Sequence, residues 1–166
     1  DEKFDNDRDE LIERIHDEFD VDLIMVVGAD IESSKRAIEL AEKYDFIVLD
    51  ADLAKCNGTT GIYKEFPERA IDVGIAEQNM ASVAAGLSSY GFIPFISSFT
   101  PFATRRVCDQ IAVSVAYAKQ KITIIGTDPG ITATLNGGTH MSFEDIGVMR
   151  SIPTMQIYDV VDEIQF

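Results

Sequence analysis

The chain has no tryptophan and only two cysteines and two histidines among its 166 residues. Cys56 and Cys108 lie far apart and outside any Cys/His pattern, so we expect free thiols, with neither a disulfide framework nor a zinc site. No run approaches the roughly 18 apolar residues that span a bilayer. The acidic N-terminus lacks the basic and then apolar segments of a secretory signal. We therefore expect a cytoplasmic protein.

Basic residues are also scarce, with 14 Lys and Arg against 29 Asp and Glu and a net charge of −15. Nucleic-acid binding needs a basic face that displaces phosphate counterions, so the charge argues against that class of partner. The excess is uneven: residues 1–46 carry 16 acidic and 6 basic side chains, and the remainder carry 13 and 8. This step in charge indicates two parts of different origin.

Apolar runs alternate with helical patterns along the whole chain. Strands are predicted at 21–28, 46–53, 70–75, 93–99, 121–127 and 155–160. Helices are predicted at 5–19, 32–45, 76–91, 104–120 and 142–152. This alternation predicts a single α/β domain over residues 1–166, with a three-layer, doubly wound and mainly parallel sheet of about six strands and helices on both faces.

The least regular stretches, 53–61 and 127–141, follow predicted strands, where ligands bind in such folds. Taken singly, the polar and aromatic residues near these ends have ordinary explanations. Glu77 complements a helix dipole, and Phe99 and Phe102 fill a strand-to-helix corner. His140 is a solvated or capping side chain in a loop, although the Gly-Gly-Thr turn before it would let the backbone approach a ligand closely.

Three segments change this interpretation when they are taken together. FPERAIDVGIAEQNMASVAAGL, IPFISSFTPFATRRVCDQI and GGTHMSFEDIGVMRSIP occur in this order. The series resembles the pyrimidine-binding domain of transketolases and of their split two-subunit relatives, over residues 47–166. Deoxyxylulose-phosphate synthases share this family, so the sequence leaves the sugar substrate open.

The resemblance implies roles for four residues. Glu77 would bind N1′ of the aminopyrimidine of thiamine diphosphate and support its proton transfer, so it is both a catalytic and a cofactor-binding residue. Phe99 and Phe102 would line the pyrimidine pocket. His140 would contact substrate oxygens and move protons near neutral pH. Asn136 replaces a residue that is often acidic in the family, which bears on substrate specificity.

Other polar residues near the strand ends keep open roles. Arg105 is a candidate for phosphate binding or for a structural contact. Asp50 and Asp52 are equally suited to capping a helix or touching a ligand. Asp72 is expected to accept hydrogen bonds from neighbouring backbone.

The resemblance also implies that this chain holds only part of the cofactor. The family binds the diphosphate and Mg²⁺ on another domain with a GDG motif, and no GDG occurs here. We therefore expect no metal ligands on this chain, a diphosphate-binding domain or subunit as partner, and self-association through an exposed apolar face.

Residues 1–46 instead resemble TatD-type metal-dependent hydrolases without their HxH metal motif, and His16 lacks a partner there. This favours an engineered chimera with its seam at 46/47, built on a pyrimidine-binding domain and without complete activity alone. The alternative is a natural split-transketolase fragment that supports ketol transfer with a diphosphate-binding partner.

Overall fold

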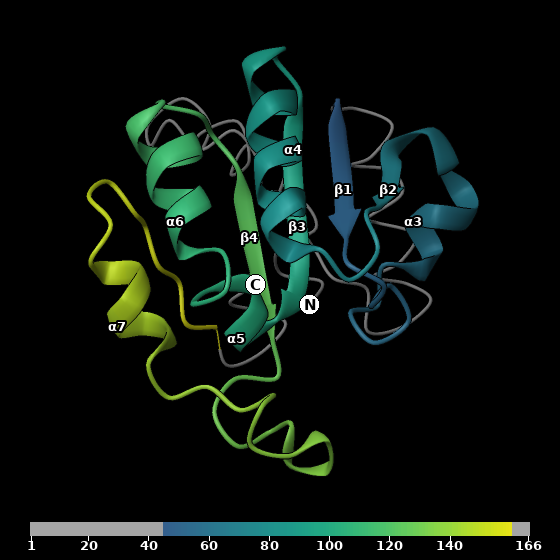
Figure 1. Cartoon of the computed structure of the whole chain (residues 1–166). Coiled ribbons are helices and arrows are strands. Elements are labelled where there is room, and N and C mark those ends of the chain that lie inside the picture. Colours follow the sequence, from purple (N-terminus) through teal and green to yellow (C-terminus); the bar gives the residue numbers. More distant parts are fainter. Residues whose placement is uncertain (1–44, 161–166) are drawn as a thin grey trace, which may run out of the picture.

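A computed structural model describes residues 45–160 (Figure 1). Within this range a four-stranded sheet has the order β2-β1-β3-β4, and every neighbouring pair is parallel. The strands are β1 (Phe46–Asp50), β2 (Ala70–Asp72), β3 (Ile93–Phe99) and β4 (Thr123–Thr127). The predicted α/β class is thereby confirmed. The strand predicted at 21–28 and the helices predicted before residue 45 lie outside the described residues.

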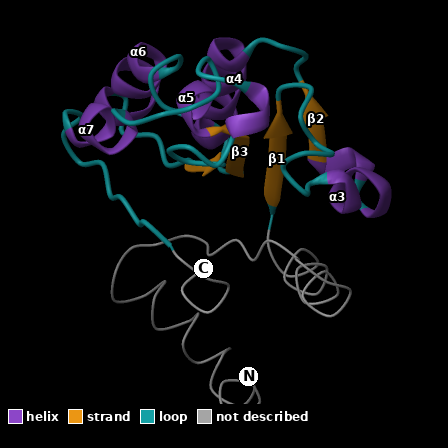
Figure 2. Ribbon diagram, turned by 90° about the horizontal axis from the view of Figure 1, so that it is seen from below, coloured by secondary structure: helices purple, strands orange, loops and turns teal. Residues whose placement is uncertain are grey.

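Helices and short turns connect the strands. They are α3 (Thr60–Glu65), α4 (Glu77–Ser89), α5 (Thr100–Ala103), α6 (Cys108–Gln110) and α7 (Asp145–Arg150), with a π-helical stretch at Ile111–Tyr117 and 3₁₀ turns at Pro67–Arg69 and Thr134–Asn136. Figure 2 shows α4, α5 and α6 grouped on one side of the strands. No helix in the described part of the chain is long and apolar enough to cross a membrane.

Strand β1 is buried along its whole length, as its continuous apolar run predicts. Because successive side chains of a strand point to opposite faces, Ile47 and Leu49 join one core cluster and Phe46 and Val48 join another. The first cluster also contains Met80, Ala81, Ala84, Ile96, Val107 and Ile111, and the second contains Phe95 and Ile125. The sheet is therefore packed on both faces.

Residues 155–160 do not form the predicted sixth strand, because they have no strand pairing. Met155 and Ile157 nevertheless pack against the larger core cluster, while Tyr158 is exposed. An alternating pattern reports which side of an extended segment is buried, and here that burial occurs without a hydrogen-bonded ladder.

The helix predicted over 104–120 is shorter than its pattern. The backbone of Thr104 leaves the helical region at φ −118° and ψ −85°, and helical structure resumes only at Cys108. Two consecutive arginines, Arg105 and Arg106, occupy the break. Their side chains make the contacts that organise the candidate site described below.

The strand order reverses direction at β1. The chain passes from β1 to its neighbour β2, and then returns through α4 across β1 to β3 on the other side. In open α/β sheets such a reversal leaves a crevice outside the carboxyl ends of the strands, where ligands bind. The segments that follow β2, β3 and β4 therefore meet at one edge.

Gly126 in β4 has little room for a side chain. A Cβ built there would lie 2.9 Å from Thr100 Oγ1 and 3.2 Å from Thr100 Cα, and this hydroxyl donates to the Thr127 carbonyl at 2.8 Å. We predict that Gly126→Ala lowers the free energy of unfolding by about 1–3 kcal/mol, because overpacking forces side chains and backbone to shift.

Gly86→Ala provides the matched control, since a Cβ at this position in α4 would meet nothing within 4 Å. It should raise the free energy of unfolding by about 0.5–1 kcal/mol, because alanine has less conformational freedom to lose than glycine. Urea denaturation measures both variants. Equal stabilities for Gly126→Ala and the unchanged chain would contradict the close contact.

Candidate functional site

Glu77 begins helix α4, directly after the turn that follows β2. Its side chain is 4% exposed, and a carboxylate in the first turn of a helix is favoured by the partial positive charge of the helix end. Burial of a charged group requires a partner. The structure supplies one in Arg106, whose Nη1 donates to Glu77 Oε1 at 2.6 Å.

Three rings from two regions of the sequence form one cluster. Phe99 ends β3 and Phe102 lies in α5, and their centroids are 6.2 Å apart in an edge-to-face arrangement. The His140 ring lies 5.4 Å from Phe99 and 5.1 Å from Phe102. Three of the four residues predicted for the site thus form one aromatic cluster.

Arg106 joins the carboxylate to this cluster. Its guanidinium carbon lies 3.8 Å from the Phe102 ring centroid, within the range of a cation–π contact. This residue is not among those predicted from the sequence. Helical periodicity gives no signal for it, because its contact with Phe102 is made across the break in the helix at Thr104.

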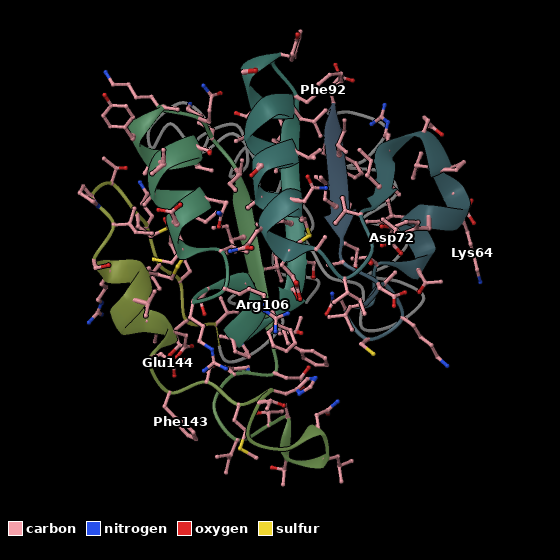
Figure 3. All side chains as sticks on the ribbon, viewed as in Figure 1. Lys64, Asp72, Phe92, Arg106, Phe143 and Glu144 are labelled. Atoms are coloured by element: carbon pink, nitrogen blue, oxygen red, sulfur yellow. The ribbon has the colours of Figure 1, made fainter. Side chains whose placement is uncertain are left out.

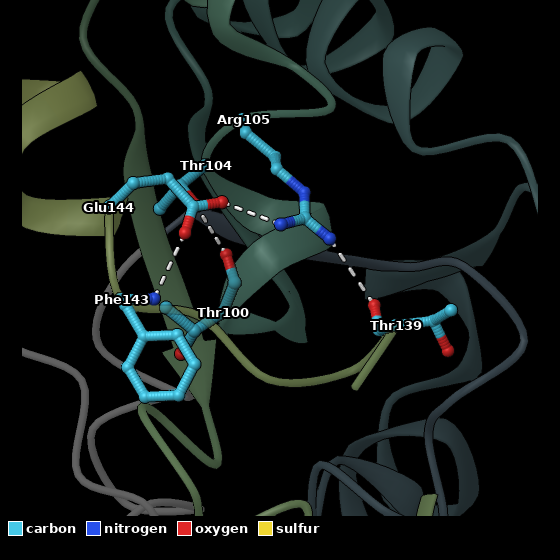
Figure 4. Close-up of polar contacts among 6 residues, drawn as sticks. All are labelled: Thr100, Thr104, Arg105, Thr139, Phe143 and Glu144. Atoms are coloured by element: carbon cyan, nitrogen blue, oxygen red, sulfur yellow. Dashed lines mark hydrogen bonds and ion pairs between the residues drawn. The ribbon is translucent and has the colours of Figure 1, made fainter. Parts of the chain in front are cut away.

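Arg105 has a structural role in this conformation (Figure 4). Its Nη1 donates to Glu144 Oε1 at 2.6 Å and its Nη2 to the Thr139 carbonyl at 3.3 Å. Glu144 Oε2 accepts from the Phe143 N–H at 3.0 Å. These contacts hold the loop that carries His140 against the end of α5. Of the two roles left open for Arg105, the structural one is observed.

The same contacts change the titration of Glu144. The Phe143 N–H and then the Arg105 guanidinium stabilise the carboxylate, and the pKa of Glu144 falls from its ordinary value of 4.5 to about 2. In Figure 3 Arg106, Phe143 and Glu144 all lie near the carboxyl ends of the strands, and Phe92 lies at the opposite end.

Backbone conformation, rather than close approach, explains the first glycine before His140. Gly137 has φ +86°, and a Cβ at Gly137 or Gly138 would meet nothing within 4 Å. Left-handed backbone is readily adopted only by glycine. Asn136 ends the preceding 3₁₀ turn and is exposed. The Thr139 hydroxyl and His140 Nδ1 lie 2.9 Å apart, which fixes one side of the imidazole.

Asp50 is completely buried at the end of β1. Its Oδ1 accepts from the Leu53 N–H at 2.6 Å, and its Oδ2 accepts from Asn57 Nδ2 and Thr59 Oγ1, both at 3.1 Å. Burial raises the pKa of Asp50, and the hydrogen bonds oppose that rise. Asp50 therefore organises the loop after β1.

This loop is tied to the neighbouring strands as well. Thr127 Oγ1 donates to Asn57 Oδ1 at 3.1 Å, which connects the end of β4 to the loop. Burial, with the nearby charges of Asp50 and Asp72, raises the pKa of Tyr63.

The predicted backbone role of Asp72 is confirmed, because its Oδ1 accepts from the N–H groups of Asp52 and Gly74 at 3.0 and 2.8 Å.

The comparisons with known proteins identify one family. A model of the transketolase pyrimidine-binding domain matches residues 24–166. The match begins inside residues 1–46, the segment that we compared with metal-dependent hydrolases. It therefore lends no support to a hydrolase-derived segment or to a seam at 46/47.

Individual relatives agree with the family match. The chain is 57% identical over 129 residues to a 6-deoxy-6-sulfo-D-fructose transketolase subunit from Clostridium sp. (strain MSTE9), covering 77% of this chain and 40% of that protein. It is 34% identical over 114 residues to an apulose-4-phosphate transketolase subunit from Actinobacillus succinogenes, covering 69% and 37%. The chain thus spans about two fifths of the length of these relatives.

A solved structure described as a split gene transketolase, inactive beta4 tetramer, is also similar. It superposes with a TM-score of 0.67 at 41% sequence identity, over 80% of this chain and 42% of that one. Fold and sequence thus point to the same family.

We predict that Arg105→Ala raises the pKa of Glu144 from about 2 but leaves it below 4.5, because the Phe143 N–H still donates. A lowered carboxylate pKa stabilises the folded chain above the unfolded value of 4.5, and this contribution is lost as the pH falls through about 2. A ¹³C NMR titration of the Glu144 carboxyl carbon measures the shift. Arg150→Ala, at an exposed position on α7, is the control, and an unchanged midpoint in Arg105→Ala would contradict the contact.

Removing the Asp50 carboxylate should destabilise the fold. Asp50→Ala leaves the Asn57 amide, the Thr59 hydroxyl and the Leu53 N–H without their acceptor, at an expected cost of about 3 kcal/mol in the free energy of unfolding. Asp50→Asn keeps one carbonyl oxygen and should lose less. Urea denaturation distinguishes the two variants, and equal losses would argue against the hydrogen-bond explanation.

Proposed function

Because the chain belongs to the transketolase pyrimidine-binding domain family, we propose that it forms the aminopyrimidine half of a thiamine diphosphate site. It would support ketol transfer together with a partner that binds the diphosphate. The observation that carries this proposal is a buried carboxylate, Glu77, which Arg106 links to the aromatic cluster of Phe99, Phe102 and His140.

The residues present fit the aminopyrimidine group. This heterocycle is flat and has a ring nitrogen that can bind a carboxyl group, and the site offers the Glu77 carboxyl group and the Phe102 ring, both contacted by Arg106. When bound, the cofactor supplies the carbanion chemistry of ketol transfer. Glu77 would bind the ring nitrogen and move its proton, and an amide at this position would not exchange that proton.

Phe99 and Phe102 would hold the heterocycle, and His140 would act at the substrate. Packing against both rings orients the imidazole, and the Thr139 hydroxyl beside Nδ1 restricts its rotation. A histidine is suited to proton transfer near neutral pH. The Arg105–Glu144 pair would act indirectly, by positioning the loop that contains His140.

The diphosphate and its Mg²⁺ would be bound by the partner. Among residues 45–160 no group of three or more His, Cys, Asp and Glu is arranged to hold a metal ion. Large apolar side chains are exposed near the site, and Ile75, Leu135 and Phe143 are 76%, 102% and 75% exposed. Such a surface suits contact with another domain or with a second copy.

The relatives favour a natural split-transketolase fragment over an engineered chimera. Two of them are described as transketolase subunits, and the similar solved structure is described as a split gene product. A subunit that carries the pyrimidine pocket and depends on a diphosphate-binding partner would account for these likenesses.

Calorimetry tests this division of the site. Titrating thiamine diphosphate and Mg²⁺ into the full chain mixed with a diphosphate-binding transketolase subunit should show tighter binding than either protein shows alone. The reason is that each protein offers only one half of the cofactor's contacts. Equal affinities with and without this chain would contradict the proposal.

The role of Glu77 is tested by Glu77→Gln in the same mixture. We expect ketol transfer to fall on the order of 10²–10⁴-fold, the usual contribution of a positioned acid or base. The melting temperature should change little, because glutamine can still accept from Arg106. Full turnover in this variant would refute the assigned role.

A further inference from the structure

Arg106 makes two contacts that the cofactor's aminopyrimidine would also need. Its guanidinium donates to Glu77 Oε1 at 2.6 Å and lies with its central carbon 3.8 Å from the Phe102 ring centroid. We define the pyrimidine seat as Glu77 Oε1 together with this face of Phe102. One planar group with nitrogen donors already fills it.

We propose that Arg106 is a built-in occupant of the pyrimidine seat, which leaves toward solvent when the aminopyrimidine binds. This inference rests on the proposed function. A guanidinium resembles the ring-protonated heterocycle in the respects that matter here, because both are flat, both donate an N–H to a carboxylate, and both favour an aromatic face. The two groups cannot occupy the same volume.

The burial of the two side chains makes this exchange physically reasonable. Glu77 is 4% exposed, so without a partner its carboxylate would be a buried and unpaired charge. Arg106 is 42% exposed, so its long side chain can turn outward into water. Arg106 thus satisfies Glu77 until the N–H of a protonated pyrimidine ring nitrogen replaces it.

The neighbouring arginine is engaged elsewhere. Arg105 contacts Glu144 and the Thr139 carbonyl, and both of these lie in the loop with His140. The departure of Arg106 therefore requires no change in the contacts of that loop. The two adjacent arginines between α5 and α6 therefore have different roles. Arg105 orders the loop with His140, and Arg106 fills the pyrimidine seat.

Competition by Arg106 lowers the apparent affinity of the chain for the pyrimidine. When only a fraction of the protein has a vacant seat, the apparent dissociation constant rises by the inverse of that fraction. Removing the guanidinium should tighten pyrimidine binding even though it also removes an ion pair. A residue that merely shaped the pocket would have the opposite effect.

The probe for this test is the free aminopyrimidine half of thiamine, with no diphosphate, so that no partner subunit is required. It is titrated into the full chain, and the dissociation constant is measured from NMR shifts of the Phe99 and Phe102 ring signals. We expect Arg106→Ala to bind the probe more tightly, on the order of fivefold, the size expected for losing a partly exposed cation–π and ion-pair contact. Arg150→Ala should match the unchanged chain.

Free guanidinium ion provides a second readout. At tens of millimolar it should refill the vacated seat in Arg106→Ala and weaken probe binding there, relative to sodium chloride of equal ionic strength. The unchanged chain, whose seat is already filled, should respond much less. Equal responses in the two proteins would overturn the proposal.

The outcomes separate this proposal from the proposed function. If the probe binds and Glu77→Gln weakens it, but Arg106→Ala binds no more tightly than the unchanged chain, only the role of Arg106 is overturned. If the probe binds none of the folded proteins, both proposals fail. Should Arg106→Ala not fold, Arg106→Lys keeps a cation but loses the planar group. Arg106→Lys is expected to bind the probe more tightly than the unchanged chain. Equal affinity in the two proteins would count against the proposal.

Discussion

The buried carboxylate of Asp50 holds together the edge on which the site is built. It ends the central strand β1 and accepts hydrogen bonds from Asn57, Thr59 and the Leu53 N–H, so the loop after β1 is fixed to its own strand. Asn57 continues the connection to Thr127 at the end of β4. A charge removed from water must be satisfied by several donors at once. That requirement determines the conformation of the loop and leaves the ends of β1, β3 and β4 in a fixed relation.

A second buried carboxylate, Glu77, is satisfied in a different way. Its observed partner is one half-exposed arginine rather than a set of fixed donors. Asp50 is thereby committed to structure, whereas Glu77 has a partner that can be exchanged. The difference lies in the partners, since Asp50 accepts from three groups of the loop that follows it and Glu77 accepts from Arg106, which also contacts Phe102. Two acidic residues with similar burial therefore differ in function: Asp50 can only stabilise the loop, whereas Glu77 can bind a ligand in place of its arginine.

Much of the fold and part of the site were accessible from sequence. Continuous apolar runs located β1, β3 and β4, and the motif series brought Glu77 and the aromatic residues into one neighbourhood. The run at 155–160 misled, because alternation reports burial and not strand pairing. Arg106 was missed since its importance depends on the break at Thr104, which periodicity does not reveal. Apart from the charge step, the chimera hypothesis rested on residues 1–46, and the family match extends into them.

The register of the parallel strands fixes the distances between the residues of the site. Glu77, Phe102 and His140 belong to segments that follow three different strands, so their separations are inherited from strand register, in which Asp50 pairs with Asp72 and Ser97, and Phe99 pairs with Thr127. A slip of one residue would displace a segment by about 3.3 Å. Functional groups tolerate only about 0.5 Å. Strand pairing inside the sheet thus determines how accurately the functional groups are placed at its edge. Substitutions that change this pairing can displace these groups without contacting the pocket.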